Sequence, residues 1–316
     1  MSNFSKSYGL FNNFLQKKER MNTIRVRKKI YPYLYQTPSI SLLIILMVIP
    51  MVTVINYSFF DNVIMKKSPN FVGLSNYKEI LSDNTFWISF YNTIYFTAAS
   101  IFFHLIIGLA FALLLNYKSL NIIAKSILRV IYIVPWLFTA TIVAIIWRLV
   151  LDPSGVINYI LLSFEMIDER IEWLSSRDTA LNTVTFINIW AGYPFYMVSL
   201  LAGLQGIPNE LYEAAKIDGA NLGQQFINIT IPQLKPIIYT LILLDFIWTI
   251  QVFPLIWMTT GGGPIHSTEM LSTYTYKLAF SKYEFSLAST SAFLTFLLSL
   301  TVSIFYIRKQ VNRTND

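Results

Sequence analysis

The stretch from Pro208 to Pro236 reads PNELYEAAKIDGANLGQQFINITIPQLKP, and it determines how the rest of the chain is interpreted. It is polar or amphipathic, and it separates two long apolar segments. In a chain this apolar, such an interruption must lie outside the bilayer, where its backbone groups are solvated or packed against protein. The sequence therefore predicts that this stretch lies at a membrane face.

The polar stretch carries the signals of a short helix, a turn and a second short helix. Asn209 is predicted to cap the first helix, with Glu210 and Glu213 in a first turn where the helix dipole favours acidic groups. Gly219 stands where that helix would end in a left-handed residue. Pro232 then marks the start of the next apolar run. We interpret the whole as a docking element for a partner in the cytosol.

A spaced set of residues in this stretch carries a family resemblance: Glu213-Ala214-Ala215, Gly219, Ile229, Ile231 and Pro232. The spacing resembles the EAA motif of permease subunits of binding-protein-dependent ABC importers, which usually have Leu where this chain has Ile231. The alternative is an ordinary capped surface helix. The resemblance implies that an ATPase subunit contacts the following residues: Glu213, Ala214, Ala215, Asp218, Gly219, Ile229 and Pro232.

Composition places the chain in a membrane. Of its 316 residues 54% are hydrophobic and 13% are charged, and its mean hydropathy is +0.51. The apolar residues gather in runs of about 20, the length that crosses a bilayer as a helix. There is no cysteine, so the sequence says nothing about disulfides. The net charge of +7 lies on segments that flank the apolar runs, which favours membrane orientation over nucleic-acid binding.

The apolar runs predict an all-α membrane protein with six transmembrane helices and a cytoplasmic coupling helix. Residues 1–38 form a basic N-terminal tail, residues 39–309 the permease domain, and residues 310–316 a C-terminal tail. Two loops, 151–179 and 259–285, are expected to lie outside the spans. The predicted spans are 39–60, 89–116, 127–150, 181–206 with an interruption at Gly192–Pro194, 237–258 and 287–307.

The distribution of positive charge sets the orientation of these spans. With both termini in the cytoplasm, sixteen lysines and arginines lie inside and eight lie outside. The positive-inside rule favours this arrangement. It also places residues 208–236 in the cytoplasm, where the resemblance requires them. We therefore expect a multi-pass protein of a bacterial-type plasma membrane with cytoplasmic N- and C-termini.

Three further segments resemble carbohydrate-uptake permeases of the maltose and glycerol-phosphate type. They are FVGLSNY at 71–77, QGIP at 205–208 and TGGGP at 260–264. The resemblance implies half of a translocation pathway for a sugar. A second homologous permease subunit, two ATP-binding subunits and an extracytoplasmic solute-binding protein would complete the importer. The chain has no phosphate-binding loop, so no cofactor is expected here and ATP would bind to a separate subunit.

Polar residues inside the predicted spans are candidates for the substrate path. Asp245 lies about nine residues into the fifth span, where a carboxylate should face protein or water. Trp248 and Thr249 are expected on its face, with Gln251 on the flank of Trp248. The alternative is that Asp245 makes only a structural hydrogen bond. Two residues near the expected interruption complete the candidates, Asn188 and Tyr193.

Two other functional classes remain open at this stage. In a proton-coupled secondary transporter, Asp245 and His104 would form a relay, although His104 alone is better explained as a packed or hydrogen-bonding residue. A membrane scaffold without transport is the third possibility. No acid pair, metal-ligand cluster or nucleophile–base pair supports an enzyme. The sequence leaves oligosaccharides, polyols and glycerol phosphates open as solutes.

Overall fold

We describe a computed structural model of the chain for residues 31, 33–117 and 120–314, with side chains to residue 308. Over these residues the regular structure is helical, with one isolated antiparallel bridge between Phe60 and Phe71. The chain divides into two units, Met1–Asn56 and Tyr57–Asp316, and each is described by itself. The predicted N-terminal tail, residues 1–38, lies almost entirely outside the described residues.

The first unit contributes one long apolar helix, Tyr33–Tyr57, whose last residue belongs to the second unit. It contains a π-helical turn, η1 (Ile44–Val48), and continues as α2 (Ile49–Tyr57). The amide of Ile49 bonds to the carbonyl of Ile44, one residue farther back than in an α-helix. The wider turn comes directly before Pro50, whose ring would otherwise clash with the preceding turn.

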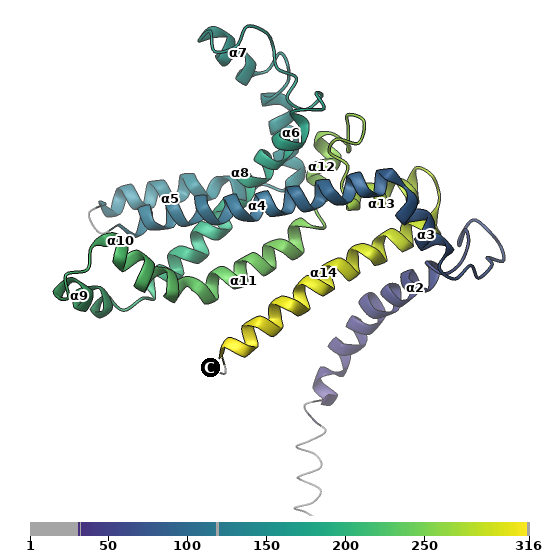
Figure 1. The fold of residues 1–316 in the computed structure, drawn as a ribbon, viewed down its shortest axis with the longest axis horizontal. Coiled ribbons are helices and arrows are strands. Elements are labelled where there is room, and N and C mark those ends of the chain that lie inside the picture. The colour runs from purple at the N-terminus through teal and green to yellow at the C-terminus, as the bar shows by residue number, and fades with distance from the viewer. Residues whose placement is uncertain (1–30, 32, 118–119, 315–316) are drawn as a thin grey trace, which may run out of the picture. The chain divides into compact units, whose positions relative to one another are not determined.

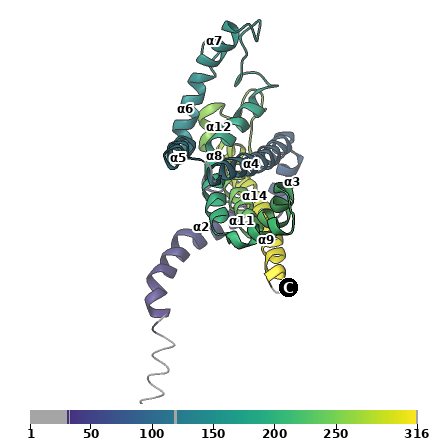
Figure 2. The same ribbon diagram turned by 90° about the vertical axis from the view of Figure 1, so that its left-hand side faces the viewer.

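The second unit is a helical bundle, labelled in Figure 1. α4 and α8 share the most extensive contact, and α11 packs on both. Figure 2 shows the same helices gathered together with α14. The elements are α3 (Ser75–Ser82), α4 (Asn84–Asn116), α5 (Ile122–Leu137), α6 (Ala140–Val150), α7 (Val156–Ser163), α8 (Ala180–Gln205), α9 (Asn209–Ile217), α10 (Leu222–Gln225), η2 (Phe226–Thr230), α11 (Ile231–Thr249), α12 (Pro254–Thr259), α13 (Leu271–Phe280) and α14 (Phe285–Thr314).

Within the described residues, five helices are long and apolar enough to cross a membrane. The sixth span depends on α5 and α6, which are bent by 98° relative to each other. The predicted span at 127–150 therefore corresponds to two helices, α5 and α6, that meet at a bend. Pro135 lies in the last turn of α5, the backbone is extended at Phe138 and Thr139, and the Thr139 hydroxyl then caps α6.

Two described helices differ from their predicted spans, one by lacking an interruption and one by its limits. α8 continues through Pro194, so the expected break at Gly192–Pro194 was wrong. Neighbouring helices allow a proline inside a membrane helix by satisfying the backbone groups it frees. The fifth span also begins earlier than predicted, because helix is continuous from Leu222 to Thr249 and contains Pro232. It ends before the predicted limit of 258, where α12 forms a separate short helix.

Both predicted outer loops contain helices that the apolar pattern did not reveal. α7 lies within 151–179 and α13 within 259–285. α13 is packed against α4 and α14, and it buries Leu271, Tyr274 and Leu278. Figure 1 shows α9 and α10 at one end of the bundle and α12 and α13 at the other.

The bundle is held closest at the crossing of α4 and α8. A Cβ added to Gly108 would lie 2.5 Å from the Cβ of Tyr196, so only glycine fits there. Small residues at such crossings let helix backbones approach closely in membranes. The buried core around this crossing includes Ala112, Met197 and Leu200. The crossing therefore fixes the relative position of α4 and α8.

Candidate coupling surface and buried polar cluster

The predicted docking element is formed by α9, a turn at Gly219, and α10. Pro208 occupies the N-cap position and Asn209 is the first helical residue, so the prediction that Asn209 caps α9 was wrong. Glu210 lies in the first turn, and Glu213 falls one turn later. Gly219 has a φ of +82°, and the amide of Ala220 bonds to the carbonyl of Ala215 at 2.8 Å. The helix thus ends in the left-handed residue that the sequence predicted.

Side-chain hydrogen bonds tie this element to the start of the long helix. The hydroxyl groups of Tyr212 and Thr230 lie 2.9 Å apart, which joins α9 to η2. The Gln225 amide donates to the Ala220 carbonyl at 2.8 Å. Asn221 caps α10 and forms a reciprocal capping box with Gln224. The element is therefore a braced structure rather than a loose loop.

The residues of the EAA-like motif divide into an exposed and a packed group. Glu213, Ala214, Asp218 and Gly219 are exposed, and Ala215 is half-buried. Nearer the helix bundle, Ile229 packs against the buried core while Pro232 remains exposed. As at Pro50, a π-helical turn (η2) ends just before Pro232. The motif thus combines an exposed patch around Gly219 with a residue, Ile229, that packs against the buried core.

Sequence reasoning missed two apolar residues on this surface. Ile217 is 88% exposed and Leu222 is 80% exposed, on either side of the Gly219 turn. Exposed large apolar residues that lie together on a polar element mark an interaction site. Leu222 also lines a cavity of about 660 Å³ whose polar lining includes Asn116, Lys125, Gln205, Glu213 and Lys216. The sequence offered one signal for this surface, namely that two aliphatic residues, Ile217 and Leu222, flank the glycine that ends α9.

The second candidate region is a buried cluster around Asp245, which is 6% exposed. One carboxylate oxygen, Oδ2, accepts hydrogen bonds from His104 Nδ1 at 2.8 Å and from the Tyr196 hydroxyl at 3.0 Å. The other, Oδ1, accepts from the Thr249 hydroxyl at 2.7 Å. His104 Nε2 lies 3.1 Å from the carbonyl oxygen of Asn188. This geometry favours the structural alternative for Asp245 that the sequence left open.

Of the other predicted substrate-path residues, Thr249 contacts Asp245, and the rest make their polar or ring contacts elsewhere. Thr249 shares its face as expected, but Trp248 is 58% exposed and packs against Phe195, with ring centroids 5.4 Å apart. Gln251 is exposed, and its amide donates to the carbonyl of Ile247 near the end of α11.

The two candidates on α8 also lie apart from the carboxylate. The Asn188 amide donates to the Ser100 hydroxyl at 2.9 Å. Tyr193 is buried against Phe111, with ring centroids 5.2 Å apart. The substrate-path assignment remains a prediction for all of these residues.

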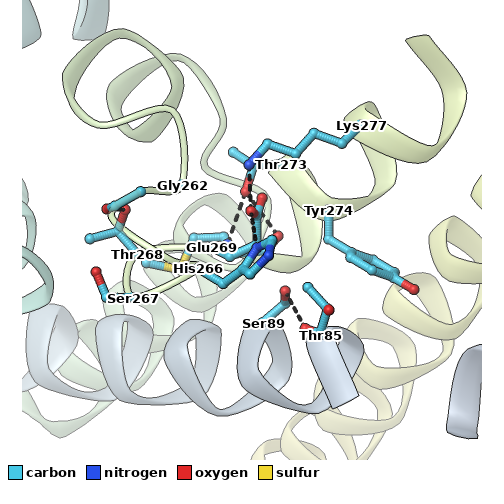
Figure 3. Close-up of polar contacts among 12 residues, drawn as sticks. Thr85, Ser89, Gly262, His266, Ser267, Thr268, Glu269, Thr273, Tyr274 and Lys277 are labelled. Atoms are coloured by element: carbon cyan, nitrogen blue, oxygen red, sulfur yellow. Dashed lines mark hydrogen bonds and ion pairs between the residues drawn. The ribbon is translucent and has the colours of Figure 1, made fainter. Parts of the chain in front are cut away.

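At the end of the bundle opposite α9, a buried carboxylate organises the 260–270 loop (Figure 3). Glu269 is 0% exposed and pairs with Lys277 and with His266, whose Nδ1 lies 3.1 Å away. The Asn92 amide donates to the carbonyls of His266, Ser267 and Glu269, each at 3.1 Å. A Cβ on Gly262 would lie 2.7 Å from Glu269 Oε2. The TGGGP segment thus has a structural reason for its glycine at 262.

A second carboxylate anchors the start of α4 at the same end. Asp83 accepts hydrogen bonds from the Thr85 amide at 2.8 Å and from the Tyr274 hydroxyl at 2.7 Å. Burial raises the pKa of Asp83, but these hydrogen bonds outweigh it and the pKa lies below the usual value of 3.8. Burial and the nearby Asp83 charge raise the pKa of Tyr274. The pair joins α4 to α13.

Comparison with known proteins assigns the chain to a family. The family of binding-protein-dependent transport system inner membrane components matches residues 104–314, which include α9, Gly219 and Asp245. The chain belongs to this family. The resemblance drawn from the EAA-like stretch is therefore confirmed, and this family member is a multi-pass membrane transport protein.

Individual relatives of this family member match nearly its whole length. The trehalose/maltose transport system permease protein MalF of Thermococcus litoralis is 34% identical over 289 residues, 90% of this chain and 95% of the relative. The sulfoquinovosyl glycerol transport system permease protein SmoG of Agrobacterium fabrum is 33% identical, and the match covers 88% of this chain and 89% of the relative. One chain of a solved bacterial ABC transporter for alginate import matches with a TM-score of 0.80 and 22% identity. The match covers 92% of this chain and 99% of the alginate transporter chain. The predicted all-α importer fold is confirmed.

Proposed function

We propose that this protein forms half of the translocation pathway of an ATP-driven importer and binds a separate ATPase subunit through α9. The observation that carries the proposal is the exposed surface of Glu213, Ala214, Ile217 and Leu222 around the Gly219 turn. This surface is braced against the start of a helix that runs unbroken to Thr249. A displacement imposed on the surface by an ATPase would therefore move a transmembrane helix as a rigid body.

The solute we propose is a sugar or a related polyhydroxylated compound. Relatives that transport trehalose and maltose, diacetylchitobiose and sulfoquinovosyl glycerol by name support this class. The exposed indole of Trp248 next to Phe195 offers an aromatic face of the kind that stacks on sugar rings, and the exposed Gln251 offers an amide. The remaining substrate-path candidates are Asp245, Thr249, Asn188 and Tyr193.

The proposed assembly contains a second homologous permease subunit, two ATP-binding subunits and an extracytoplasmic solute-binding protein, in a bilayer. A solved alginate transporter in complex with its alginate-bound periplasmic protein supports the last of these, since its permease chain has this fold with a TM-score of 0.78. We place both termini and α9 in the cytoplasm and the 260–270 loop outside. The sixteen-to-eight distribution of positive charge supports this orientation.

Two substitutions on α9 test the proposal. Glu213→Lys reverses an exposed charge, and Gly219→Pro forbids the φ of +82° that turns the chain. Both are expected to abolish uptake and ATPase co-purification while the protein still inserts. Gly223→Ala is the matched control, because its Cβ would meet only Asn221 Oδ1 at 3.4 Å. Normal uptake by both variants at normal abundance would refute the proposal.

One observation favours a second candidate function. His104 and Asp245, the predicted proton relay, lie within hydrogen-bond distance at 2.8 Å. A proton-coupled transporter would lose uptake when an uncoupler collapses the proton gradient, even with ATP present. The ATP-driven importer keeps uptake under those conditions and loses it without ATP.

A further inference from the structure

Three membrane helices meet at the Asp245 carboxylate. Asp245 lies on α11, His104 on α4, and Tyr196 on α8, and both partners bond to the same oxygen, Oδ2. We propose that His104 and Asp245 form a buried ion pair that passes the movement of the coupling surface to α4 and α8. The two are positioning residues in this account, and the inference rests on the proposed function.

The hydrogen-bond partners of His104 indicate its charge. Nδ1 faces the carboxylate of Asp245 and Nε2 faces the backbone carbonyl of Asn188. Both partners are acceptors, whereas a neutral imidazole has only one N–H to donate. A doubly protonated ring beside the ionised carboxylate satisfies both contacts, and this is the charge state that the proposal assigns to the pair. Removing one member of such a buried pair leaves the other charge without its partner.

The long helix links this pair to the coupling surface. Helix is continuous from Leu222, at the exposed turn, to Thr249. Asp245 lies 23 residues beyond Leu222, about 35 Å along the axis at the rise of an α-helix. Directly after Thr249 the helix ends, and α12 begins at Pro254. Asp245 thus lies near the far end of a continuous helix that begins at the coupling surface.

The two partners of Asp245, His104 on α4 and Tyr196 on α8, are each packed closely against the neighbouring helix. A Cβ on Gly192 would lie 2.3 Å from His104 Nε2, so the imidazole rests directly against the α8 backbone. Tyr196 packs equally closely against Gly108 of α4, because a Cβ added to Gly108 would lie 2.5 Å from the Cβ of Tyr196. A displacement of Asp245 must therefore shift both helices rather than only rotate a side chain.

The test uses the complete transporter in proteoliposomes and measures solute moved per ATP hydrolysed. Asp245→Asn and His104→Gln are each expected to lower this ratio by about tenfold, which lies within the usual range of coupling between two sites of one protein. The ATPase subunits should stay bound. The exchanged pair, His104→Asp with Asp245→His, is expected to restore most of the ratio because it keeps two opposite charges in contact.

The control is Thr97→Val on α4, because the buried Thr97 hydroxyl has no partner among the described residues. It should leave the ratio unchanged. If Asp245→Asn does not assemble, Tyr196→Phe replaces it, since it removes a single hydroxyl from the cluster, and a ratio lowered by about threefold is expected.

A purely structural role would lower abundance but leave solute per ATP unchanged in the assembled fraction, and that result would overturn the inference. The proposed function would survive it, because the ATPase still binds and still drives uptake. If the wild-type chain fails to co-purify with an ATPase, the proposed function itself fails.

Discussion

The crossing of α4 and α8 makes a quantitative prediction for Gly108→Ala. The added Cβ would lie 2.5 Å from Tyr196 Cβ and 3.0 Å from the Met197 amide nitrogen. Carbon atoms in contact sit about 3.5–4.0 Å apart, so the helices must separate by about 1 Å. Overpacking of this kind costs about 1–3 kcal/mol. Alanine returns up to about 1 kcal/mol through helix propensity, so a cost at the middle of that range leaves a net loss of about 1–2 kcal/mol.

The assay is the thermal midpoint of the purified protein in detergent, followed by the fraction that stays monodisperse. Gly108→Ala is expected to lower this midpoint by about 1–3 °C, because an unfolding entropy of about 2.1 cal/mol/K per residue gives about 1.5 °C per kcal/mol for a chain of 316 residues. Gly206→Ala is the matched control, because its Cβ would meet only backbone oxygens at 3.4 and 3.8 Å. A Gly108→Ala midpoint equal to that of the control would refute the close-packing argument.

The 260–270 loop and the α4 anchor give two further predictions. Gly262→Ala should destabilise the loop more than Gly261→Ala: both residues have positive φ, but only the Cβ at 262 meets the Glu269 carboxylate. Proteolysis of this loop measures the difference, and equal rates would contradict it. Asp83 has a lowered folded pKa, so its stabilisation is present above pH 3.8 and is lost as pH falls further. Tyr274→Phe should therefore reduce the fall in thermal midpoint on acidification; an unchanged fall would argue against this hydrogen bond.

The turn that ends α9 could be predicted from sequence because it depends on local chemistry. Gly219 is needed wherever an L side chain would be strained at positive φ. The six apolar runs and the family resemblance were likewise visible, since length and spacing carry them. The helix cap was assigned to Asn209 rather than Pro208 because propensity alone does not fix the first helical residue.

Contacts between residues far apart in the chain could not be predicted from the sequence. The sequence paired His104 with Asp245 only in the alternative of a proton relay, because they are 141 residues apart and no spacing pattern places them in contact. Trp248 was assigned to the face of Asp245 by helical spacing, but the tertiary packing on Phe195 leaves its indole exposed. The bend between α5 and α6 follows from backbone conformation at Phe138 and Thr139, residues with no breaker chemistry of their own.

The membrane face on which α9 lies, and the subunit that covers α9, decide whether this chain binds an ATPase. The chain has no cysteine, so Ala214→Cys, at an exposed position, supplies a single label site. Reaction with a membrane-impermeant maleimide is measured in inside-out and right-side-out vesicles, with and without the ATPase subunits. We expect labelling only from the cytoplasmic face, and suppression of that labelling when the ATPase is bound. Labelling from outside, or labelling that the ATPase leaves unchanged, would contradict the account.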